Sequence, residues 1–252
     1  MKSLFLNLPL LADVSKIAND DYVGFTFFVG CMAMMAASAF FFLSMNNFDR
    51  KWKTSILVSG LITFIAAVHY FYMRDYWAVV GESPTFFRYV DWTLTVPLMC
   101  VEFYLILKVA GAQKSLMWKL IFASVIMLVT GYFGEAVYTT GSGPALWGLI
   151  SGLAYFWIVY EIWFGSAKKL AEAAGGSILK AHKTLCWFVL VGWAIYPLGY
   201  MAGTAGWYNP GGASWSLSKD VIYNIGDAIN KIGFGLVVYG AAVASQSSTS
   251  EA

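Results

Sequence analysis

The sequence predicts an all-α membrane protein, a single bundle of seven transmembrane helices. Hydrophobic residues make up 59% of the chain and charged residues only 12%, whereas a soluble domain carries about 25% charged residues. The mean hydropathy is +0.65, and seven apolar segments each come close to the ~20 residues that a helix needs to cross a bilayer. This composition excludes a soluble globular protein, and the net charge of +2 gives no sign of nucleic-acid binding.

The helices are predicted in order along the chain. Residues 1 to 21 hold a short apolar run that Asn7 and Pro9 interrupt. This makes a weak signal peptide, and we expect the segment to be retained as a short interfacial helix. The membrane helices are predicted at residues 22 to 45, 54 to 74, 86 to 108, 115 to 134, 143 to 165, 183 to 204 and 217 to 243. Residues 244 to 252 form a tail too short for a signalling domain, so residues 1 to 252 are expected to be one domain.

Basic residues predict the orientation in the membrane. The loops on one side are bordered by Arg50, Lys51, Lys53, Lys108, Lys114, Lys119, Lys168, Lys169, Lys180 and Lys183. The loops on the other side are bordered only by Lys2, Lys16, Arg74, Arg88 and Lys219. Because positive charge collects on the cytoplasmic side, the N-terminus is predicted to lie outside and the C-terminus in the cytoplasm.

The cysteines Cys31, Cys100 and Cys186 all lie inside apolar segments. Their spacing matches neither a metal knuckle nor a disulfide scaffold, and we interpret them as small core hydrophobes. No metal site is expected.

Lys231 lies at the middle of the last apolar segment, DVIYNIGDAINKIGFGLVVY, about 15 Å from either end. That depth is too great for its side chain to reach water, and a charged group there needs a partner or a chemical change. Asp227, four residues earlier on the same face, is a candidate counter-ion, and condensation of the amine with an aldehyde would give a Schiff base. A buried Lys–Asp pair that only pins helix packing is the structural alternative.

The third predicted helix, RYVDWTLTVPLMCVEFYLIL, carries Arg88, Asp91, Thr95 and Glu102. Ionisable groups in a membrane helix are costly and usually mark an ion path. Asp91 and Glu102 are eleven residues apart, which places them on nearly the same face, about 16 Å apart along the helix. Lys231 is expected at a depth in the membrane between those of Asp91 and Glu102. The three groups therefore predict a relay along an ion path. Taken singly, an Arg88–Asp91 salt bridge and a back-bonded Thr95 hydroxyl are structural alternatives. A Glu102 carboxyl kept neutral by burial is another.

These motifs together resemble the microbial rhodopsins. The resemblance covers nearly the whole chain and is carried by RYVDWTLTVP in the third helix, WAIYPLGY in the sixth and DAINK in the seventh. The Asp91, Thr95 and Glu102 triplet and HYFYMR in the second helix match the proteorhodopsins most closely. The resemblance implies the microbial rhodopsin fold, a multi-pass protein of a bacterial inner membrane, and a homo-oligomer of five or six chains.

The resemblance also implies a light-driven outward proton pump. All-trans retinal would be bound as a protonated Schiff base on Lys231, and light would isomerise it to the 13-cis form. The proton would pass to Asp91, the acceptor and primary counter-ion, and Glu102 would return a proton from the cytoplasmic side. Asp227 is implied as the second counter-ion, and Arg88 as the cation below both aspartates.

A chromophore pocket is implied as well. Trp92, Trp193, Tyr196 and Pro197 match family positions that sandwich the polyene, and Tyr200 matches a further pocket position. Flat rings suit an elongated conjugated ligand. Because 18% of the chain is aromatic, a packing role is the alternative for any one ring.

Two further residues would tune the site. Met99 matches the family's spectral-tuning position, where an apolar side chain goes with green absorption and glutamine with blue; core filling is the alternative. His69, in HYFYMR, matches a histidine that bonds the acceptor aspartate, and its imidazole would modulate Asp91. A satisfied core histidine or an oligomer contact is the alternative for His69.

Gly148, in ALWGLISGLAYFW, falls where bacteriorhodopsin has a tryptophan and typical proteorhodopsins a phenylalanine against the retinal ring. Its small size is expected to open a lipid-facing window. Xanthorhodopsins have glycine at the matching place and dock a carotenoid antenna in the window. Close helix packing through a small residue is the favoured alternative to a carotenoid site, since the other motifs match proteorhodopsins.

The proton-release group stays open. The outer loop from Gly206 to Lys219 has no glutamate, so a paired-carboxylate release cluster like that of bacteriorhodopsin is missing there and early release is in doubt. Glu135, at the outer end of the fourth helix, is one candidate. A solvated helix-end charge is its alternative.

Two other functions compete with a proton pump. A photosensory receptor that signals through a separate transducer would share the Lys231 pocket, but a carboxyl donor at Glu102 gives it no advantage. Chloride or sodium pumps are the second alternative, and the relatives that carry those ions lack the combination of Asp91, Thr95 and Glu102.

Overall fold

The computed structural model describes residues 18, 20–209 and 216–250. Its α-helices are α2 Tyr22–Ser44, α3 Arg50–Val80, α4 Thr85–Leu107, α5 Lys114–Tyr132, α6 Gly143–Trp163, α7 Ser166–Ala174, α8 Gly176–Trp187, α9 Ile195–Gly203 and α10 Ser216–Ser250. Short 3-10 turns, η1 Met45–Asn47 and η2 Lys108–Ala110, and π turns, η3 Phe133–Val137 and η4 Phe188–Gly192, extend or join them. The predicted N-terminal interfacial helix falls on residues 1–17 and 19, outside the described part of the chain.

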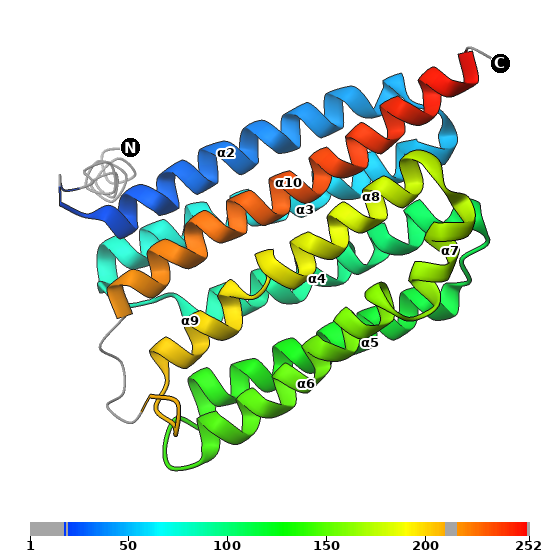
Figure 1. Cartoon of the computed structure of the whole chain (residues 1–252). Helices are drawn as coiled ribbons and strands as arrows, with labels where there is room; N and C mark the ends of the chain where they lie inside the picture. Colours follow the sequence, from blue (N-terminus) through cyan, green and yellow to red (C-terminus); the bar gives the residue numbers. More distant parts are fainter. Residues whose placement is uncertain (1–17, 19, 210–215, 251–252) are drawn as a thin grey trace, which may run out of the picture.

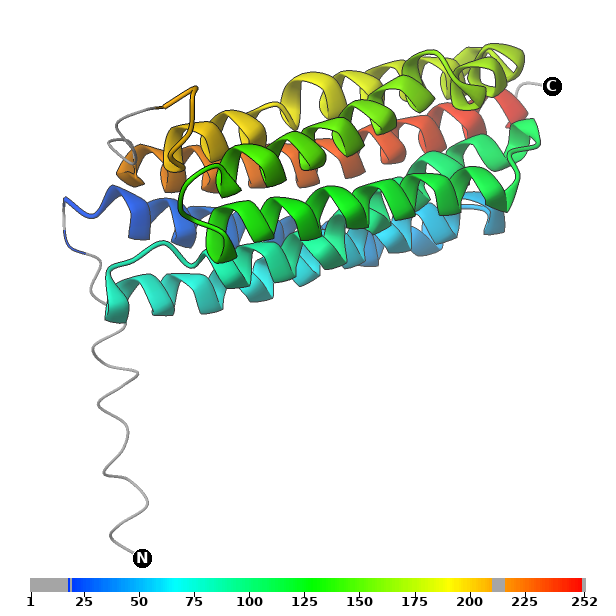
Figure 2. The ribbon, with the colours of Figure 1, turned by 90° about the horizontal axis from the view of Figure 1, so that it is seen from below.

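The helices form a closed bundle (Figure 1). Within the described residues, seven helical spans are long and apolar enough to cross a membrane. Each span packs against the next along the chain, and α10 closes the ring by packing against α2 and α3 on one side and α8 and α9 on the other. Figure 2 shows the same helices running side by side from end to end. The predicted all-α, seven-helix fold is confirmed, and α10 also reaches α4.

Local sequence explains several helix ends. The Asp21 side chain caps α2 by accepting a hydrogen bond of 2.8 Å from the Gly24 N–H. The same carboxylate oxygen accepts one of 3.0 Å from the Trp77 indole, which ties α2 to α3. Helix α3 ends at Gly81, whose φ of +71° is in the left-handed region that favours glycine.

The sixth membrane span differs from the single regular helix predicted at residues 183 to 204. It consists of α8 and α9 joined at the π turn η4. Asn230 of α10 donates a 2.9 Å hydrogen bond to the Gly192 carbonyl in this turn. A Cβ at Gly192 would lie only 2.1 Å from Asn230 Oδ1, so the close approach requires glycine. The buried Trp193 directly follows this π turn.

Other boundaries also moved. Helix α3 runs from Arg50 to Val80, longer than the predicted segment at 54 to 74. Helix α7 occupies a predicted loop, and α10 continues to Ser250 through most of the predicted tail. Helix α7 and the C-terminal part of α10 are rich in polar residues, so a hydropathy pattern does not detect them.

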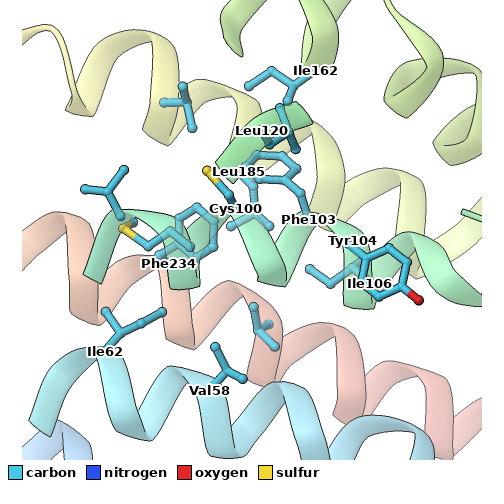
Figure 3. Close-up of a cluster of buried hydrophobic side chains, with 14 of the residues drawn as sticks. Val58, Ile62, Cys100, Phe103, Tyr104, Ile106, Leu120, Ile162, Leu185 and Phe234 are labelled. Atoms are coloured by element: carbon cyan, nitrogen blue, oxygen red, sulfur yellow. The ribbon is translucent and has the colours of Figure 1, made fainter. Parts of the chain in front are cut away.

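Apolar side chains fill the predicted cytoplasmic half of the bundle (Figure 3). The labelled side chains come from α3, α4, α5, α6, α8 and α10; they are Val58, Ile62, Cys100, Phe103, Tyr104, Ile106, Leu120, Ile162, Leu185 and Phe234. The rings of Phe103 and Phe234 meet edge to face, with centroids 5.7 Å apart. All three cysteines are buried and free. This layer separates the middle of the bundle from the cytoplasmic end.

The outer surface of the bundle is apolar as well. Large exposed side chains on it include Phe64, Val68, Phe122, Leu149, Trp157 and Leu236. A soluble monomer rarely exposes so much contiguous apolar surface, whereas lipid chains are a suitable neighbour for it.

Candidate functional site

A buried amine lies between two carboxylates at the centre of the bundle. Lys231 Nζ is 2.5 Å from Asp91 Oδ2 and 3.2 Å from Asp227 Oδ2. The three side chains are at most 2% exposed. The structure therefore brings together the lysine and both aspartates that the sequence singled out, from α10 and α4.

Both carboxylate oxygens of Asp227 accept hydrogen bonds from surrounding side chains. Tyr70 donates to its Oδ2 at 2.8 Å, and Tyr196 donates to its Oδ1 at 2.5 Å. The Trp92 indole N–H lies 3.1 Å from each oxygen. Hydrogen bonds to an ionised acceptor are strong, so these donors and Lys231 hold Asp227 as a fixed anion.

Only one carboxylate oxygen of Asp91, Oδ2, has a hydrogen-bond partner among the described residues. Its Oδ1 atom is buried and has no hydrogen-bond partner in the described part of the chain. His69 Nδ1 lies 3.8 Å from this oxygen and donates instead to the Ile65 carbonyl at 2.9 Å. The expected His69–Asp91 hydrogen bond is therefore not made, since 3.8 Å exceeds hydrogen-bonding distance. The Thr95 hydroxyl donates to the Asp91 main-chain carbonyl at 2.9 Å, as in its structural alternative.

Glu102 lies farther along α4 than Asp91. It is fully buried, and its Oε1 accepts a 2.9 Å hydrogen bond from the Ser59 hydroxyl of α3. Its Oε2 has no partner among the described residues. The next residue in the chain, Phe103, belongs to the buried apolar cluster (Figure 3). A carboxyl group in these surroundings is isolated from bulk water.

Arg88 turns away from the central amine. Its guanidinium donates to Asp220 at 2.8 Å and to Asn224 at 3.1 Å. It lies 5.3 Å from the ring centroid of Phe27 and 5.2 Å from that of Tyr223. The sequence placed this cation below the central aspartates, and the structure directs its hydrogen bonds to a third carboxylate.

Glu135 forms a second ion pair at the same end of the bundle. Lys219 Nζ lies 2.9 Å from Glu135 Oε1, and the two side chains are 8% and 5% exposed. The Tyr89 hydroxyl donates to Glu135 Oε2 at 2.9 Å. Glu135 is therefore not the solvated helix-end charge that the sequence left open.

Two of the predicted pocket residues, Trp92 and Tyr196, donate to Asp227 beside the amine. Trp92, Met99 and Trp193 are buried in one cluster, and Tyr196 packs against it. The rings of Trp92 and Tyr196 meet edge to face, with centroids 4.9 Å apart. Pro197 is exposed in the structure, and its place in the pocket stays a prediction.

The space beside Gly148 is filled. A Cβ at Gly148 would lie 2.7 Å from Cε1 of Tyr200. Tyr200 is 7% exposed, and its hydroxyl donates to the Pro144 carbonyl at 2.6 Å. In this structure the tyrosine ring occupies the expected opening, and the glycine permits close packing.

Sequence reasoning missed Tyr70, Asp220 and Asn224. A signal for two of them was present: polar residues recur at 220, 224, 227 and 231, which are steps of four, three and four along one helix face. Tyr70 had no comparable signal, because it is one of two tyrosines in HYFYMR and only its buried position separates them.

Comparisons with known proteins agree with this architecture. The family model described as "Bacteriorhodopsin-like protein" matches residues 21–245. A green-light absorbing proteorhodopsin from Gamma-proteobacterium EBAC31A08 is 43% identical over 228 residues, covering 90% of this chain and 89% of the relative. The crystal structure of a blue light-absorbing proteorhodopsin from Med12 has a TM-score of 0.74 and 40% identity, covering 88% of this chain and 98% of that one. The structure of xanthorhodopsin, titled a light-driven ion pump with dual chromophore, has a TM-score of 0.78 and 28% identity, with coverages of 92% and 98%.

Proposed function

This chain belongs to the bacteriorhodopsin-like family, and from that premise we propose that it is a light-driven pump that moves protons outward. It is a multi-pass bacterial membrane protein and an ion pump rather than an enzyme. The observation that carries the proposal is the buried Lys231 amine, 2.5 Å from a carboxylate that has one free oxygen. A proton that leaves the amine has an acceptor within reach.

Membership of the family implies a retinal chromophore. The residues present fit such a group: Lys231 supplies a primary amine at mid-depth, and Trp92, Trp193 and Tyr196 supply flat apolar walls. When bound, retinal supplies a light-driven change of geometry at a Schiff-base nitrogen formed from Lys231. The chain itself positions that nitrogen and holds the charges around it.

The two central aspartates take different roles in the proposal. Asp227 accepts hydrogen bonds from Tyr70, Tyr196 and Trp92, which stabilise its charged form, so it remains the fixed counter-ion. Asp91 has a free oxygen and no comparable set of donors. Asp91 therefore accepts the proton.

Glu102 returns the proton. It lies three turns beyond Asp91 on α4, toward the predicted cytoplasmic end, and its burial favours a protonated carboxyl group. The apolar layer around it limits leakage of protons from the cytoplasm. A photosensory receptor would not need this donor, so its position supports the pump over that alternative.

The proposal sets the direction of transport through the orientation of the chain. The positive-inside rule puts the end with Glu102 in the cytoplasm, so protons leave at the end with Asp220 and Glu135. Assembly into a pentamer or hexamer in the membrane is part of the same proposal, and His69, which is 20% exposed, is close enough to the surface to contact a neighbouring copy.

A carotenoid antenna is a separate proposal that rests on Gly148. The similarity to xanthorhodopsin, titled a pump with dual chromophore, supports it, while the Tyr200 ring that fills the space beside Gly148 favours simple packing. Carotenoid binding would require Tyr200 to move. Adding lutein or zeaxanthin to the retinal-loaded protein tests this: blue-light energy transfer that disappears in Gly148→Trp establishes the antenna, and no transfer refutes it.

Light-driven pH changes test the main proposal. Cells that make the protein and receive retinal are illuminated while the external pH is recorded, with and without a protonophore. We expect acidification that the protonophore abolishes. No pH change would favour a sensor, and alkalinisation enhanced by the protonophore would indicate transport of another ion.

A further inference from the structure

A pocket of about 400 Å³ lies at the predicted cytoplasmic end of the bundle, between the start of α5 and α7 (Figure 1). Ser115 and Lys119 line it from α5, and they are four residues apart. Ser166 lines it from α7, together with Lys169 and Leu170, which follow three and four residues later. Residues at these spacings share one face of a helix, so each helix turns one face to the pocket. Its volume is within the ~300–1,000 Å³ that is typical of small-molecule sites.

The charge of the pocket is entirely positive. Lys119 and Lys169 line it, and no acidic residue does. Within the described part of the chain, neither lysine forms a salt bridge. The neighbouring Lys168 differs, because its amine lies 3.8 Å from the Glu172 carboxylate on the same helix. The pocket therefore holds two ammonium groups without a counter-ion from the protein, and an anion there would be attracted to both.

The hydrogen-bond donors around the pocket are of two kinds. The Ser166 hydroxyl is already engaged, because it donates to Glu161 Oε1 at 2.5 Å, and its main-chain N–H donates to the same oxygen at 3.2 Å. The Gln113 amide and the Ser115 hydroxyl also line the pocket, and their side chains make no hydrogen bond to the rest of the described chain. Both can donate to oxygen atoms of a ligand.

The pocket lies where the bundle meets the membrane surface. The membrane-spanning segment that contains α5 begins at Lys114, one residue before Ser115. Trp118 is 61% exposed, and tryptophan collects at the level of lipid head groups. Leu116 and Leu170 add an apolar wall. Positive charge and free donors are thus combined with apolar surface at head-group depth.

We propose that this pocket binds the phosphate group of an anionic membrane phospholipid. Lys119 and Lys169 pair with the phosphate, Gln113 and Ser115 donate to its oxygens, and the apolar wall contacts the start of the acyl chains. Basic pockets of this kind at the cytoplasmic ends of membrane helices suit lipid head groups. Helix α7 packs against η2, α4, α6 and α8, so the bound phosphate adds a bridge from α7 to α5. Free phosphate has the same chemistry, and the test below separates the two sources.

Native mass spectrometry of the purified full-length, retinal-loaded protein in detergent tests the inference. Phosphatidylglycerol and zwitterionic phosphatidylcholine are titrated separately, and the visible colour reports that each protein is folded. The wild type should retain one tightly bound phosphatidylglycerol and bind phosphatidylcholine more weakly. Each lysine near the head groups should contribute about fivefold to the affinity, so Lys119→Gln combined with Lys169→Gln should weaken this site about 25-fold.

The matched control removes two lysines from the same end of the bundle but outside the pocket. Lys180→Gln combined with Lys183→Gln, both on α8, changes the net charge equally and should leave the tight site within about twofold of the wild type. Ser115→Trp keeps both pocket lysines and fills the space between them, so it should abolish tight binding. If the pocket double variant forms no coloured protein, Lys169→Gln and Ser115→Trp decide in the same way.

Three results would overturn the inference. The first is an equal affinity for phosphatidylglycerol in the pocket double variant and the α8 control. The second is tight binding retained in Ser115→Trp, and the third is equal affinity of the wild type for the two lipids. Inorganic phosphate, added in excess over the lipid, should not displace phosphatidylglycerol; displacement that depends on Lys119 and Lys169 would assign the pocket to a soluble phosphate and refute the lipid. None of these readouts depends on transport, so they leave the proposed pump to its own test.

Discussion

Lys231 Nζ lies closer to Asp91, at 2.5 Å, than to Asp227, at 3.2 Å, although Asp227 is one turn away on the same helix. The closer carboxylate comes from α4 and keeps one oxygen free, while the other is held by Tyr70, Tyr196 and Trp92. Two chemically identical side chains are thus prepared for different tasks. One can receive a proton, and the other holds a charge in place.

Removal of the central amine should abolish colour. Lys231→Ala leaves no amine for retinal at mid-depth, so we expect a folded protein without a visible absorption band after retinal is added. Among the described residues the other buried lysine is Lys219, and Lys219→Met is the matched control that should remain coloured. Visible absorption retained in Lys231→Ala would contradict the assignment.

Loss of the Asp91 charge should stop transport and shift the absorption to the red. The negative charge beside Lys231 stabilises the cation in the dark state, and Asp91→Asn removes it. Acid titration of the wild type should give the same red shift as Asp91 becomes protonated. An unshifted spectrum in Asp91→Asn, measured on folded protein, would exclude Asp91 as the primary counter-ion.

Glu102→Gln should slow the return of the proton to the Lys231 site. A positioned general acid typically contributes on the order of a hundredfold or more in rate, so the decay of the deprotonated intermediate should lengthen by about that factor. Added azide, a small mobile acid, should partly restore the rate. Flash photolysis measures this, and an unchanged decay would rule out Glu102 as the donor.

Met99→Gln should shift the absorption maximum to shorter wavelength. Met99 is 2% exposed and belongs to the same buried cluster as Trp92 and Trp193, so a polar group there would change the field along the pocket. Visible absorption spectra of the two purified proteins give the answer. If the maxima coincide, Met99 is a packing residue only.

The Lys219–Glu135 pair should matter for stability. Breaking a buried pair leaves an uncompensated charge and costs about 3–5 kcal/mol, so Lys219→Met should lower the thermal midpoint of the retinal-loaded protein. Adding Glu135→Gln should recover most of that loss, because the second charge is then gone. Equal midpoints for the single variant and the wild type would show that water already reaches the pair.

The seven-helix bundle could be predicted from the sequence, because burying a charge in a membrane is so costly that membrane helices contain few ionisable residues. The seven apolar segments stand out from the polar loops, and Lys231, Asp91 and Glu102 stand out within them. The π turn η4 was not predictable, since it depends on Asn230 of another helix reaching the Gly192 carbonyl. A sequence pattern shows the periodicity of a single helix, so it does not predict a hydrogen bond between two helices.

The directions in which side chains point could not be predicted from the sequence either. Arg88 could pair with Asp91 or with Asp220, and only the packing of α4 against α10 decides in favour of Asp220. Pro197 is exposed in the structure, which the motif WAIYPLGY alone does not reveal. The contact of Tyr200 with Gly148 joins α9 to α6, so the pattern of either helix alone does not predict it.

The most direct test of the account compares light-driven proton movement by wild-type protein and Asp91→Asn, each loaded with retinal and reconstituted in vesicles of known orientation. We predict that the wild type moves protons from the face that carries Lys168 and Lys169 to the opposite face, and that Asp91→Asn binds retinal but moves none. Proton movement in the reverse direction, or transport retained in Asp91→Asn, would contradict it.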